Sequence, residues 1–457
     1  MTYLKSWRVI AVSFVAVGVL ALSNIASVSA SSLSTTTLVT AGIHGFGGSG
    51  YSFTNSSNSM THDGQTVVFY SDASNLVADD TNNVTDVFSY NRITKMTERL
   101  SMGLDGKQTS TPSAYPSISD DGRYVAFITA THLPYDNPRA NCDNNVCNDV
   151  FVLDRQTKHI SRANLTPSGS RLDAFEVGCV ISGNGRYVVF GSPSSTLEGS
   201  YDPDNSSNLF VRDMQVNTTK MVSVNTAGRF ADGGFANDPS ISDDGRYIAF
   251  GSASKLLPES TPSNSVYVRD MQRDVTTLVA SRYSYHPAIS ANGKVIAFES
   301  NARLATNDTN DFRDIYTYDL PTKATRLVSV SSNGTQANNY SDSPAISGDG
   351  SYVVFASDAS NLVPADSNSF TDIFIRYRNY GITRRVDVAS HDGVQALPGY
   401  FTRRPTISRD GKAIAYSTDA QNLVPGHISY VIDLYQTYNP VVGIPYYDPG
   451  DFIGVLR

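Results

Sequence analysis

The sequence predicts an all-β fold, a seven-bladed β-propeller made of four-stranded antiparallel blades. One hairpin pattern recurs seven times along the 457 residues, at intervals of roughly 50 to 60 residues, which is typical of propellers. Each copy is followed by further β-rich runs that bring the repeat to four strands. Another β-rich run, at residues 35–40, precedes the first copy and is expected to close the ring.

The hairpin is clearest at residues 116–127 (PSISDDGRYVAF) and nearly intact at residues 239–250 and 344–355. Every copy contains Asp-Gly or Asn-Gly, which suits a tight primed turn because both central residues then need positive φ. The seven pairs are Asp63-Gly64, Asp121-Gly122, Asn184-Gly185, Asp244-Gly245, Asn292-Gly293, Asp349-Gly350 and Asp410-Gly411.

Third and fourth strands follow each hairpin. Residues 149–154 (DVFVLD) and 372–377 (DIFIRY) are expected third strands, and residues 325–330 (TRLVSV) are an expected fourth strand. An isolated four-stranded sheet leaves its apolar faces open, and radial stacking of seven such sheets buries them.

Ring closure is expected from the N-terminal strand, because residues 35–40 (TTTLVT) resemble fourth strands and the last repeat has only three clear strands. Closure would remove two exposed sheet edges. The alternative is that residues 441–447 complete the last blade. We assign residues 1–30 to a signal peptide, 31–440 to one propeller domain and 441–457 to a C-terminal tail.

The N-terminal segment has the pattern of a cleaved secretory signal. Lys5 and Arg8 precede an apolar run over residues 9–22, and Val28-Ser29-Ala30 offers small residues for cleavage. The run is shorter than the roughly 20 residues of a spanning helix, although an uncleaved anchor is the alternative. We therefore expect a secreted or periplasmic protein with no membrane contact after cleavage.

The net charge of −8 argues against nucleic acid and anionic membranes as partners, and no basic run offsets it. The repeat fills the mature chain, so we expect a monomer with one domain. Short turns gather at one end of the blades, and long loops, such as residues 164–176 and 227–237, gather at the other. We expect function on this long-loop face, because loops on a rigid scaffold carry recognition.

The pattern P-[SA]-I-S-x-[DN]-G-[RK]-x-[VI]-[AV]-F resembles the WD40-like repeat of TolB-type propellers over nearly all of the mature chain. The resemblance implies a propeller and an envelope or secreted location. TolB itself carries an α/β domain ahead of its propeller, for which this chain has no room. The Trp-Asp signature of eukaryotic WD repeats is missing.

Acidic loops after the second strands suggest a metal. The pattern Asp-x-Asn-x-x-x-Asp offers hard oxygens at alternate positions, which suits calcium. Alternatively, these side chains only cap their own loops through backbone hydrogen bonds. The residues are Asp80, Asn82 and Asp86; Asp143, Asn145 and Asp149; Asp308, Asn310 and Asp314; Asp366, Asn368 and Asp372; and the variant Asp202, Asp204 and Asn208.

Other reactive residues give no catalytic pattern. Cys142 and Cys147 are candidates for a small disulfide, and Cys179 is expected to be half-buried. The seven histidines are scattered, and the sequence has neither a Gly-x-Ser-x-Gly elbow nor a phosphate loop. We therefore expect a non-catalytic module that binds a protein or glycan partner. The alternatives are a polysaccharide lyase or hydrolase with its site at the channel mouth, and a structural envelope component.

Overall fold

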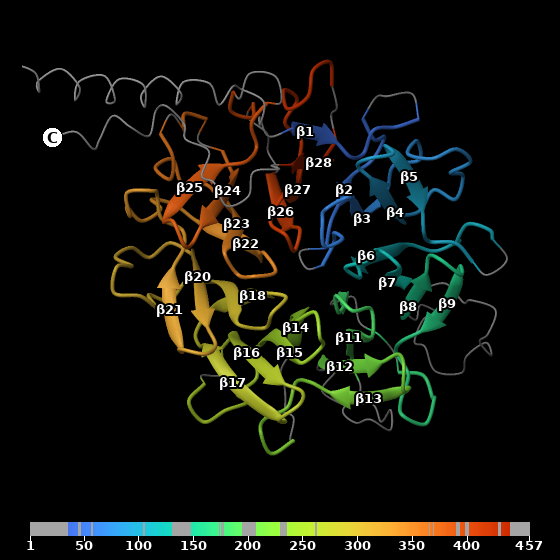
Figure 1. Cartoon of the computed structure of the whole chain (residues 1–457), viewed down its shortest axis with the longest axis horizontal. Helices are drawn as coiled ribbons and strands as arrows, with labels where there is room; N and C mark the ends of the chain where they lie inside the picture. Colours follow the sequence, from blue (N-terminus) through green and yellow to red (C-terminus); the bar gives the residue numbers. More distant parts are fainter. Residues whose placement is uncertain are drawn as a thin grey trace, which may run out of the picture.

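The structure is a computed structural model in which seven four-stranded sheets stand around a central channel (Figure 1). It describes residues 35–43, 47–55, 58–103, 106–129, 148–172, 174, 178–193, 207–228, 235–260, 263–364, 366–368, 370–389, 394–397, 402–427 and 431–438. The predicted signal peptide, tail and Cys142–Cys147 bridge lie outside these ranges. No helix long and apolar enough to span a membrane occurs within them.

Each blade runs from an inner strand at the channel to an outer strand at the rim. Blade 1 contains β2 (Ser52–Phe53), β3 (Thr66–Ser71), β4 (Asp86–Asn91) and β5 (Met96–Arg99). Blade 2 contains β6 (Ser113–Ile118), β7 (Tyr124–Thr129), β8 (Asp149–Asp154) and β9 (His159–Arg162). Blade 3 contains β10 (Cys179–Ile181), β11 (Tyr187–Ser192), β12 (Asn208–Asp213) and β13 (Thr218–Met221).

The remaining blades follow the same order. Blade 4 contains β14 (Ala236–Ile241), β15 (Tyr247–Ser252), β16 (Ser265–Asp270) and β17 (Val275–Ala280). Blade 5 contains β18 (Ser284–Ile289), β19 (Val295–Ser300), β20 (Asp314–Asp319) and β21 (Ala324–Leu327). Blade 6 contains β22 (Ser341–Ile346), β23 (Tyr352–Ser357), β24 (Asp372–Tyr377) and β25 (Ile382–Arg385). Blade 7 contains β26 (Thr402–Ile407), β27 (Ala413–Thr418), β28 (Asp433–Tyr438) and β1 (Thr35–Leu38).

Closure by the N-terminal strand is confirmed. Strand β1 pairs antiparallel with β28, with Leu38 opposite Tyr435. Just beyond β1, the Thr40 hydroxyl donates to Asp433 Oδ1 at 2.7 Å and accepts the Leu434 N–H at 3.1 Å. The last blade therefore combines a strand from the N-terminal part of the chain with three strands from its C-terminal part.

The hairpin turn differs from the predicted primed type. Its glycine has positive φ in all seven blades, as at Gly122 (φ 75°), but the preceding Asp or Asn does not. Gly122 N–H instead donates to Ser119 O, which forms a turn closed by a left-handed glycine. Asp121 Oδ1 accepts both the Ser119 hydroxyl and the Arg123 N–H. The Ser and Asp of the motif therefore stabilise the loop together. The prediction considered only how readily Asp and Gly adopt positive φ and so missed this role.

Adjacent blades are also joined at these turns, on the end of the channel that we call the tight face. Here a backbone N–H of each blade donates to a turn carbonyl of the next, from His62 N–H to Asp120 O around to Asp410 N–H to His62 O. The Arg409 guanidinium lies 3.0 Å from Asp243 Oδ1 and 3.5 Å from Asp120 Oδ1 across this end. The turns therefore form a continuous ring of hydrogen bonds.

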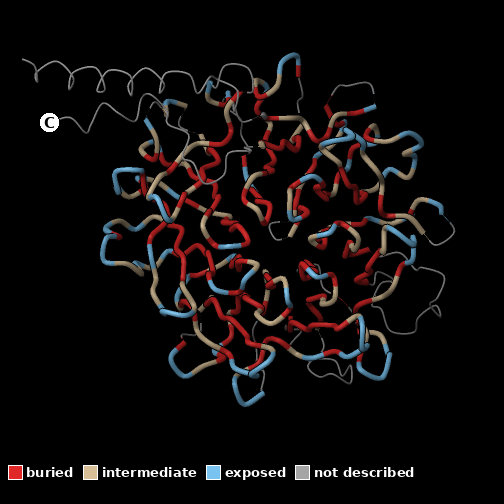
Figure 2. Tube along the Cα trace, in the orientation of Figure 1, coloured by how far each residue is buried: buried red, intermediate tan, exposed pale blue. Residues whose placement is uncertain are grey.

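The core lies between the blades, where buried residues of neighbouring sheets pack together (Figure 2). The Tyr187 ring fits against the turn of the next blade, where a Cβ added to Gly245 would come within 2.0 Å of it. Met60, Ile289, Ile346 and Ile407 are among the residues that line a small cavity of about 20 Å³ at the inner side of the blades. This volume corresponds to about one water molecule. We call the end of the channel beside the long loops its mouth.

Candidate functional site

A strained position recurs on the inner strands, in their halves nearer the long loops. The residue seven places before the turn glycine has positive φ in each of blades 2 to 7. In five of these blades it forms a β-bulge in the inner hairpin. We call these residues the mouth ring: Tyr115, Gly178, Asp238, His286, Ser343 and Arg404.

The chemistry of the mouth ring varies although its backbone does not. Glycine is the residue that adopts positive φ most cheaply, and only blade 3 uses it, at Gly178 (φ 86°). A left-handed backbone costs an ordinary residue about 1–2 kcal/mol. Strain of this kind is typical of functional sites. Five polar or aromatic side chains are therefore held at the mouth against a local conformational preference.

His286 is the centre of a charged cluster in the ring. Its Nδ1 lies 3.1 Å from Glu299 Oε1 on β19, and its Nε2 lies 3.6 Å from Asp238 Oδ2 in the preceding blade. Glu299 also accepts a bond from Arg313 Nη1 at 3.0 Å and from Ser343 N–H at 2.9 Å. Residues of three blades therefore meet in this cluster, with the buried Glu299 carboxylate bound by blades 5 and 6 and Asp238 of blade 4 reaching His286.

These contacts determine the charge of the cluster. Burial alone would lower the pKa of His286, but its hydrogen bond to Glu299 and the charges of Asp238, Glu299 and Asp342 raise this pKa to about 9. Burial is the largest single effect on Glu299 and raises its pKa, but the hydrogen bond and charge of His286, the Ser343 N–H and the charge of Arg313 together lower the net pKa. At neutral pH His286 is therefore an imidazolium and Glu299 a carboxylate, and the imidazole is not available as a base.

Arg404 is the centre of a second group of contacts at the mouth, between blades 7 and 1. Its Nη1 donates to the Tyr70 hydroxyl at 2.6 Å, and its guanidinium lies 5.1 Å from the centre of the Phe53 ring. Tyr70 in turn packs on Tyr115 of the mouth ring, with ring centres 5.6 Å apart. The neighbouring Arg403 is paired with Asp342 of blade 6 at 3.1 Å. Contacts between side chains thus link blades 6, 7, 1 and 2 at the mouth.

Exposed aromatic rings surround the mouth at another repeated position, directly before an inner strand. In four blades the carbonyl of this residue accepts the N–H of the residue that follows the second strand. We call these four residues the rim aromatics: Tyr51 (50% exposed), Phe235 (58%), Tyr283 (58%) and Tyr340 (46%). They stand at the long-loop ends of the inner strands of blades 1, 4, 5 and 6, and Tyr340 also packs edge-to-face with Phe312 at 5.1 Å between ring centres.

The predicted acidic triads come together in blades 1, 5 and 6. In blade 1 Asn82 Nδ2 donates to Asp86 Oδ2 at 2.8 Å, and Arg99 lies 3.2 Å from Asp80. In blade 6 Arg385 lies 3.5 Å from Asp366 and 3.3 Å from Asp372. An arginine of the outer strand thus occupies the position between the carboxylates that a calcium ion would need. Backbone capping occurs as well, since Asn82 accepts Val84 N–H and Asn368 accepts Phe370 N–H.

Blade 5 differs because Leu327 replaces the arginine there. Gln336 Nε2 bridges Asp308 Oδ1 and Asp314 Oδ2 at 2.7 Å each. Burial raises the pKa of Asp314 to about 6, since no cation offsets it. Asn310 caps the loop by accepting Phe312 N–H and donating to Ala337 O. Of the described loops, this one fits calcium best, and calcium binding stays a prediction.

The other two loops are only partly described. Asp143, Asn145, Asp202 and Asp204 lie outside the described residues. Asp149 pairs with Arg162 and Arg171, and Asn208 accepts the Ser223 hydroxyl. Across the residues that the structure covers, no three His, Cys, Asp or Glu side chains are placed to hold a metal ion. Cys179 is fully buried, more than expected, and burial raises the pKa of its thiol.

A second repeated motif explains these loops and was missed in the sequence. The loop between blades carries Gly-x-Gln or Gly-x-Arg, and its last residue reaches the preceding acidic loop, as Gln108, Arg171, Gln336 and Gln395 do. Glu299 and Tyr70 could also have been recognised as unusual from the sequence. The same second-strand position is Gly191, Gly251, Ala356 or Ser417 in other blades, so a large polar residue there stands out.

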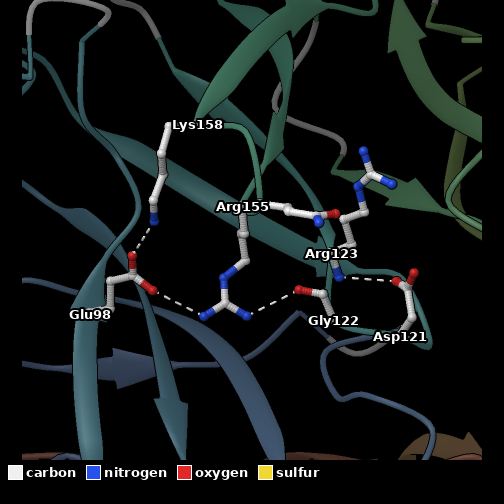
Figure 3. Close-up of a pocket in the computed structure, with 7 residues that line it drawn as sticks. Glu98, Asp121, Gly122, Arg123, Arg155 and Lys158 are labelled. Carbon is white, nitrogen blue, oxygen red and sulfur yellow. Dashed lines mark hydrogen bonds and ion pairs between the residues drawn. The ribbon is translucent and has the colours of Figure 1, made fainter.

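Away from the mouth, hollows lie between blades 1 and 2 and between blades 3 and 4. The one drawn in Figure 3 measures about 470 Å³ and is lined by Glu98, Arg123, Arg155 and Lys158. Glu98 binds both Arg155 at 3.0 Å and Lys158 at 2.8 Å, and Arg155 also donates to Gly122 O. These charges pair with one another and join two blades, so we assign this hollow a structural role.

Comparisons with known proteins support the fold. No family model matches the sequence, and no curated protein matches it. Among solved structures, an oligogalacturonate lyase in complex with manganese aligns with a TM-score of 0.53 at 13% identity, covering 90% of this chain and 95% of the lyase. The propeller domain of the Trilobed protease from Pyrococcus furiosus aligns with a TM-score of 0.50 at 10% identity, covering 86% and 96%. Such identities show the propeller fold alone.

TolB is also among the structural neighbours. TolB from Acinetobacter baumannii aligns with a TM-score of 0.36 at 11% identity, covering 82% of this chain and 80% of TolB. The broad resemblance to propeller proteins therefore holds, and the narrower resemblance to TolB stays a prediction. The Pyrococcus propeller is described as having an open velcro topology, whereas β1 closes the ring here.

Proposed function

We propose that this chain is an exported, non-catalytic propeller that binds a glycan over the channel mouth on its long-loop face. The observation that carries the proposal is the arrangement of four exposed rim aromatics around the strained mouth ring. Tyrosine and phenylalanine present flat, rigid apolar faces, and tyrosine adds a polar edge. Sugar rings have apolar faces and polar edges of the same kind.

A glycan fits this face better than a protein partner does. The rim aromatics stand at separate blades around a charged centre instead of forming one continuous apolar patch, and protein interfaces have a hydrophobic core inside a polar rim. The rim aromatics and the mouth ring both lie at the long-loop ends of the inner strands. We therefore place the ligand across the mouth, with its rings on the rim aromatics.

Calorimetric titration with soluble polysaccharides tests this function. Polygalacturonate, xylan and dextran are suitable ligands, because the structural neighbours include an oligogalacturonate lyase. We expect at least one of them to bind, and the double substitution Tyr283→Ala and Tyr340→Ala to lower its affinity at least tenfold. The matched control is Tyr380→Ala, which removes a tyrosine equally exposed (54%) in the turn between β24 and β25 on the tight face. Absence of binding, or an equal loss in the control, would contradict the proposal.

An enzyme is the second candidate, because His286, Glu299 and Asp238 meet at the mouth. Polysaccharide cleavage needs a group that moves a proton, and the imidazolium of His286 is a possible acid. Incubation of the same polysaccharides with the wild-type chain and with the His286→Asn variant separates the candidates. Shortened products that disappear in the variant would establish the enzyme, and unchanged chain length with retained binding would support the binding module.

Export and calcium belong to this proposal as well. The apolar run after Lys5 and Arg8 supports export. Calcium would be held by Asp308 and Asp314 in blade 5, where it would replace the missing arginine and stabilise the folded ring.

A further inference from the structure

We propose that Arg404 determines the specificity of this site by binding a carboxylate of the glycan, so that the propeller selects acidic over neutral chains. This inference rests on the proposed function and adds the class of ligand. Its basis is the Arg404 guanidinium, which neutral side chains hold in place and which no carboxylate of the described residues pairs with.

The orientation comes from two neutral groups. The Tyr70 hydroxyl accepts one N–H of Arg404 at 2.6 Å, and the Phe53 ring lies beneath the guanidinium at 5.1 Å. A guanidinium carries five N–H donors in a planar fork. Arg404 is an exposed residue, so its remaining donors are open to solvent at the mouth. A planar fork with free donors matches the two oxygens of a carboxylate.

Arg404 differs in this respect from the other repeated arginines. Arg123, Arg186 and Arg246 on the tight face each pair with an aspartate, at 2.7, 2.6 and 2.8 Å. At the mouth, Arg313 pairs with Glu299 and Arg403 with Asp342. No carboxylate among the described residues pairs with Arg404. His286, Arg313 and Arg403 thus pair with Asp238, Glu299 and Asp342, and Arg404 adds a cation to these described pairs.

The backbone at Arg404 supports a functional reason for the residue. Its φ is 56°, where an arginine is disfavoured and glycine or asparagine is better accommodated. The equivalent position in blade 3 is Gly178, so the fold itself does not need a side chain there. A long cationic side chain at such a position lowers stability locally and is consistent with a role in binding.

Because the backbone of residue 404 suits asparagine, the charge can be removed there without disturbing the fold. Arg404→Asn removes the charge and suits positive φ, so it should fold at least as well as the wild type. Arg404→Lys keeps the charge and loses the planar fork. Arg326→Asn on the exposed outer strand β21 is the matched control, because it makes the same change away from the mouth.

The ligands are polygalacturonate, alginate and hyaluronan, each compared with its methyl ester, in which the carboxylates are neutral. We expect at least one acid form to bind at least tenfold more tightly than its ester, with an affinity that falls as salt rises. Arg404→Asn should remove this difference, Arg404→Lys should reduce it, and Arg326→Asn should leave it unchanged. The melting temperature of each variant reports whether it is folded.

The outcomes separate the two proposals. If acid and ester bind equally, or if Arg404→Asn keeps the preference, this inference is wrong and glycan binding stands. If neither these polymers nor their esters bind, the inference is wrong, and the neutral glycans xylan and dextran then decide glycan binding. If an acidic peptide binds at the mouth and none of the glycans does, both proposals are wrong and a protein partner is indicated.

Discussion

His286 Nδ1 lies 3.1 Å from Glu299 Oε1, and this pair joins the inner strand of blade 5 to its second strand at the channel mouth. Glu299 is 1% exposed and His286 is 49% exposed, so a buried carboxylate holds a cation that faces the solvent. The pair also meets Asp238 of blade 4 and the Ser343 N–H of blade 6. The cluster therefore contributes both to the stability of the ring and to the charge that a ligand meets.

Stability should fall at alkaline pH through His286. Its pKa is raised from 6.5 to about 9, so the pairing stabilises the fold fully below pH 6.5 and is lost as the pH rises through about 9. We expect a loss of about 1 kcal/mol, because water screens the half-exposed imidazolium. Urea unfolding at several pH values measures it. The His286→Asn variant, which suits positive φ, should lack this step, and a variant with the same step would assign it to another group.

The turn glycines should tolerate no side chain where the next blade packs on them. Gly245 has φ 76°, and a Cβ would lie 2.0 Å from the Tyr187 ring. Gly245→Val should therefore combine backbone strain with a displaced ring, at about 3 kcal/mol or more. Gly228→Val is the control, because Gly228 has φ 75° and open space around it, so only strain of about 1–2 kcal/mol remains. Equal losses in chemical denaturation would refute the packing of Tyr187 on this turn.

Removal of β1 should open the ring. Deletion of residues 35–40 removes the partner of β28 and both bonds of Thr40. The exposed edge of β28 should then lower the melting temperature and cause aggregation that increases with protein concentration. Removal of residues 441–457 is the control and should change neither. If the two deletions behaved in the opposite way, the closure described here would be incorrect.

Calcium should act through blade 5. A ligand that binds only the folded state raises stability by RT ln(1 + [L]/Kd), so calcium should raise the melting temperature and a chelator should reverse the rise. The Asp308→Asn variant should lose this response. Asp80→Asn in blade 1 should keep it, because Arg99 already lies 3.2 Å from that carboxylate. Equal melts of the wild type with calcium and with chelator would leave all these loops with a capping role.

The fold could be predicted because its information is local and repeated. The Asp-Gly hairpin recurs in one frame, and the predicted third strands at residues 149–154 and 372–377 match β8 and β24. The fourth strand was predicted too long. Strand β21 ends at Leu327, because Val330 bridges to Gln336 in the loop hairpin that reaches the acidic residues.

The site was harder to predict, because its contacts join different blades. His286 meets Asp238, and Arg404 meets Tyr70, across long stretches of sequence. The mouth ring has no motif of its own, since each blade places a different residue there. The positive φ of these residues could not be predicted either. Five of the six precede a proline, and a residue before proline is normally expected to be extended. The sequence does show that Tyr70 and Glu299 are large polar residues at a position that is Gly191, Gly251, Ala356 or Ser417 in four other blades and Ile128 in blade 2.

The central claim is that the ligand lies across the channel mouth, and hydrogen–deuterium exchange tests it most directly. The amide exchange of the wild-type chain would be compared with and without the polysaccharide that binds best. We predict slower exchange at residues 283–287, 340–344 and 402–405, which hold rim aromatics and the mouth ring in blades 5 to 7. Unchanged exchange there, with protection at tight-face turns such as residues 119–123, would contradict the account.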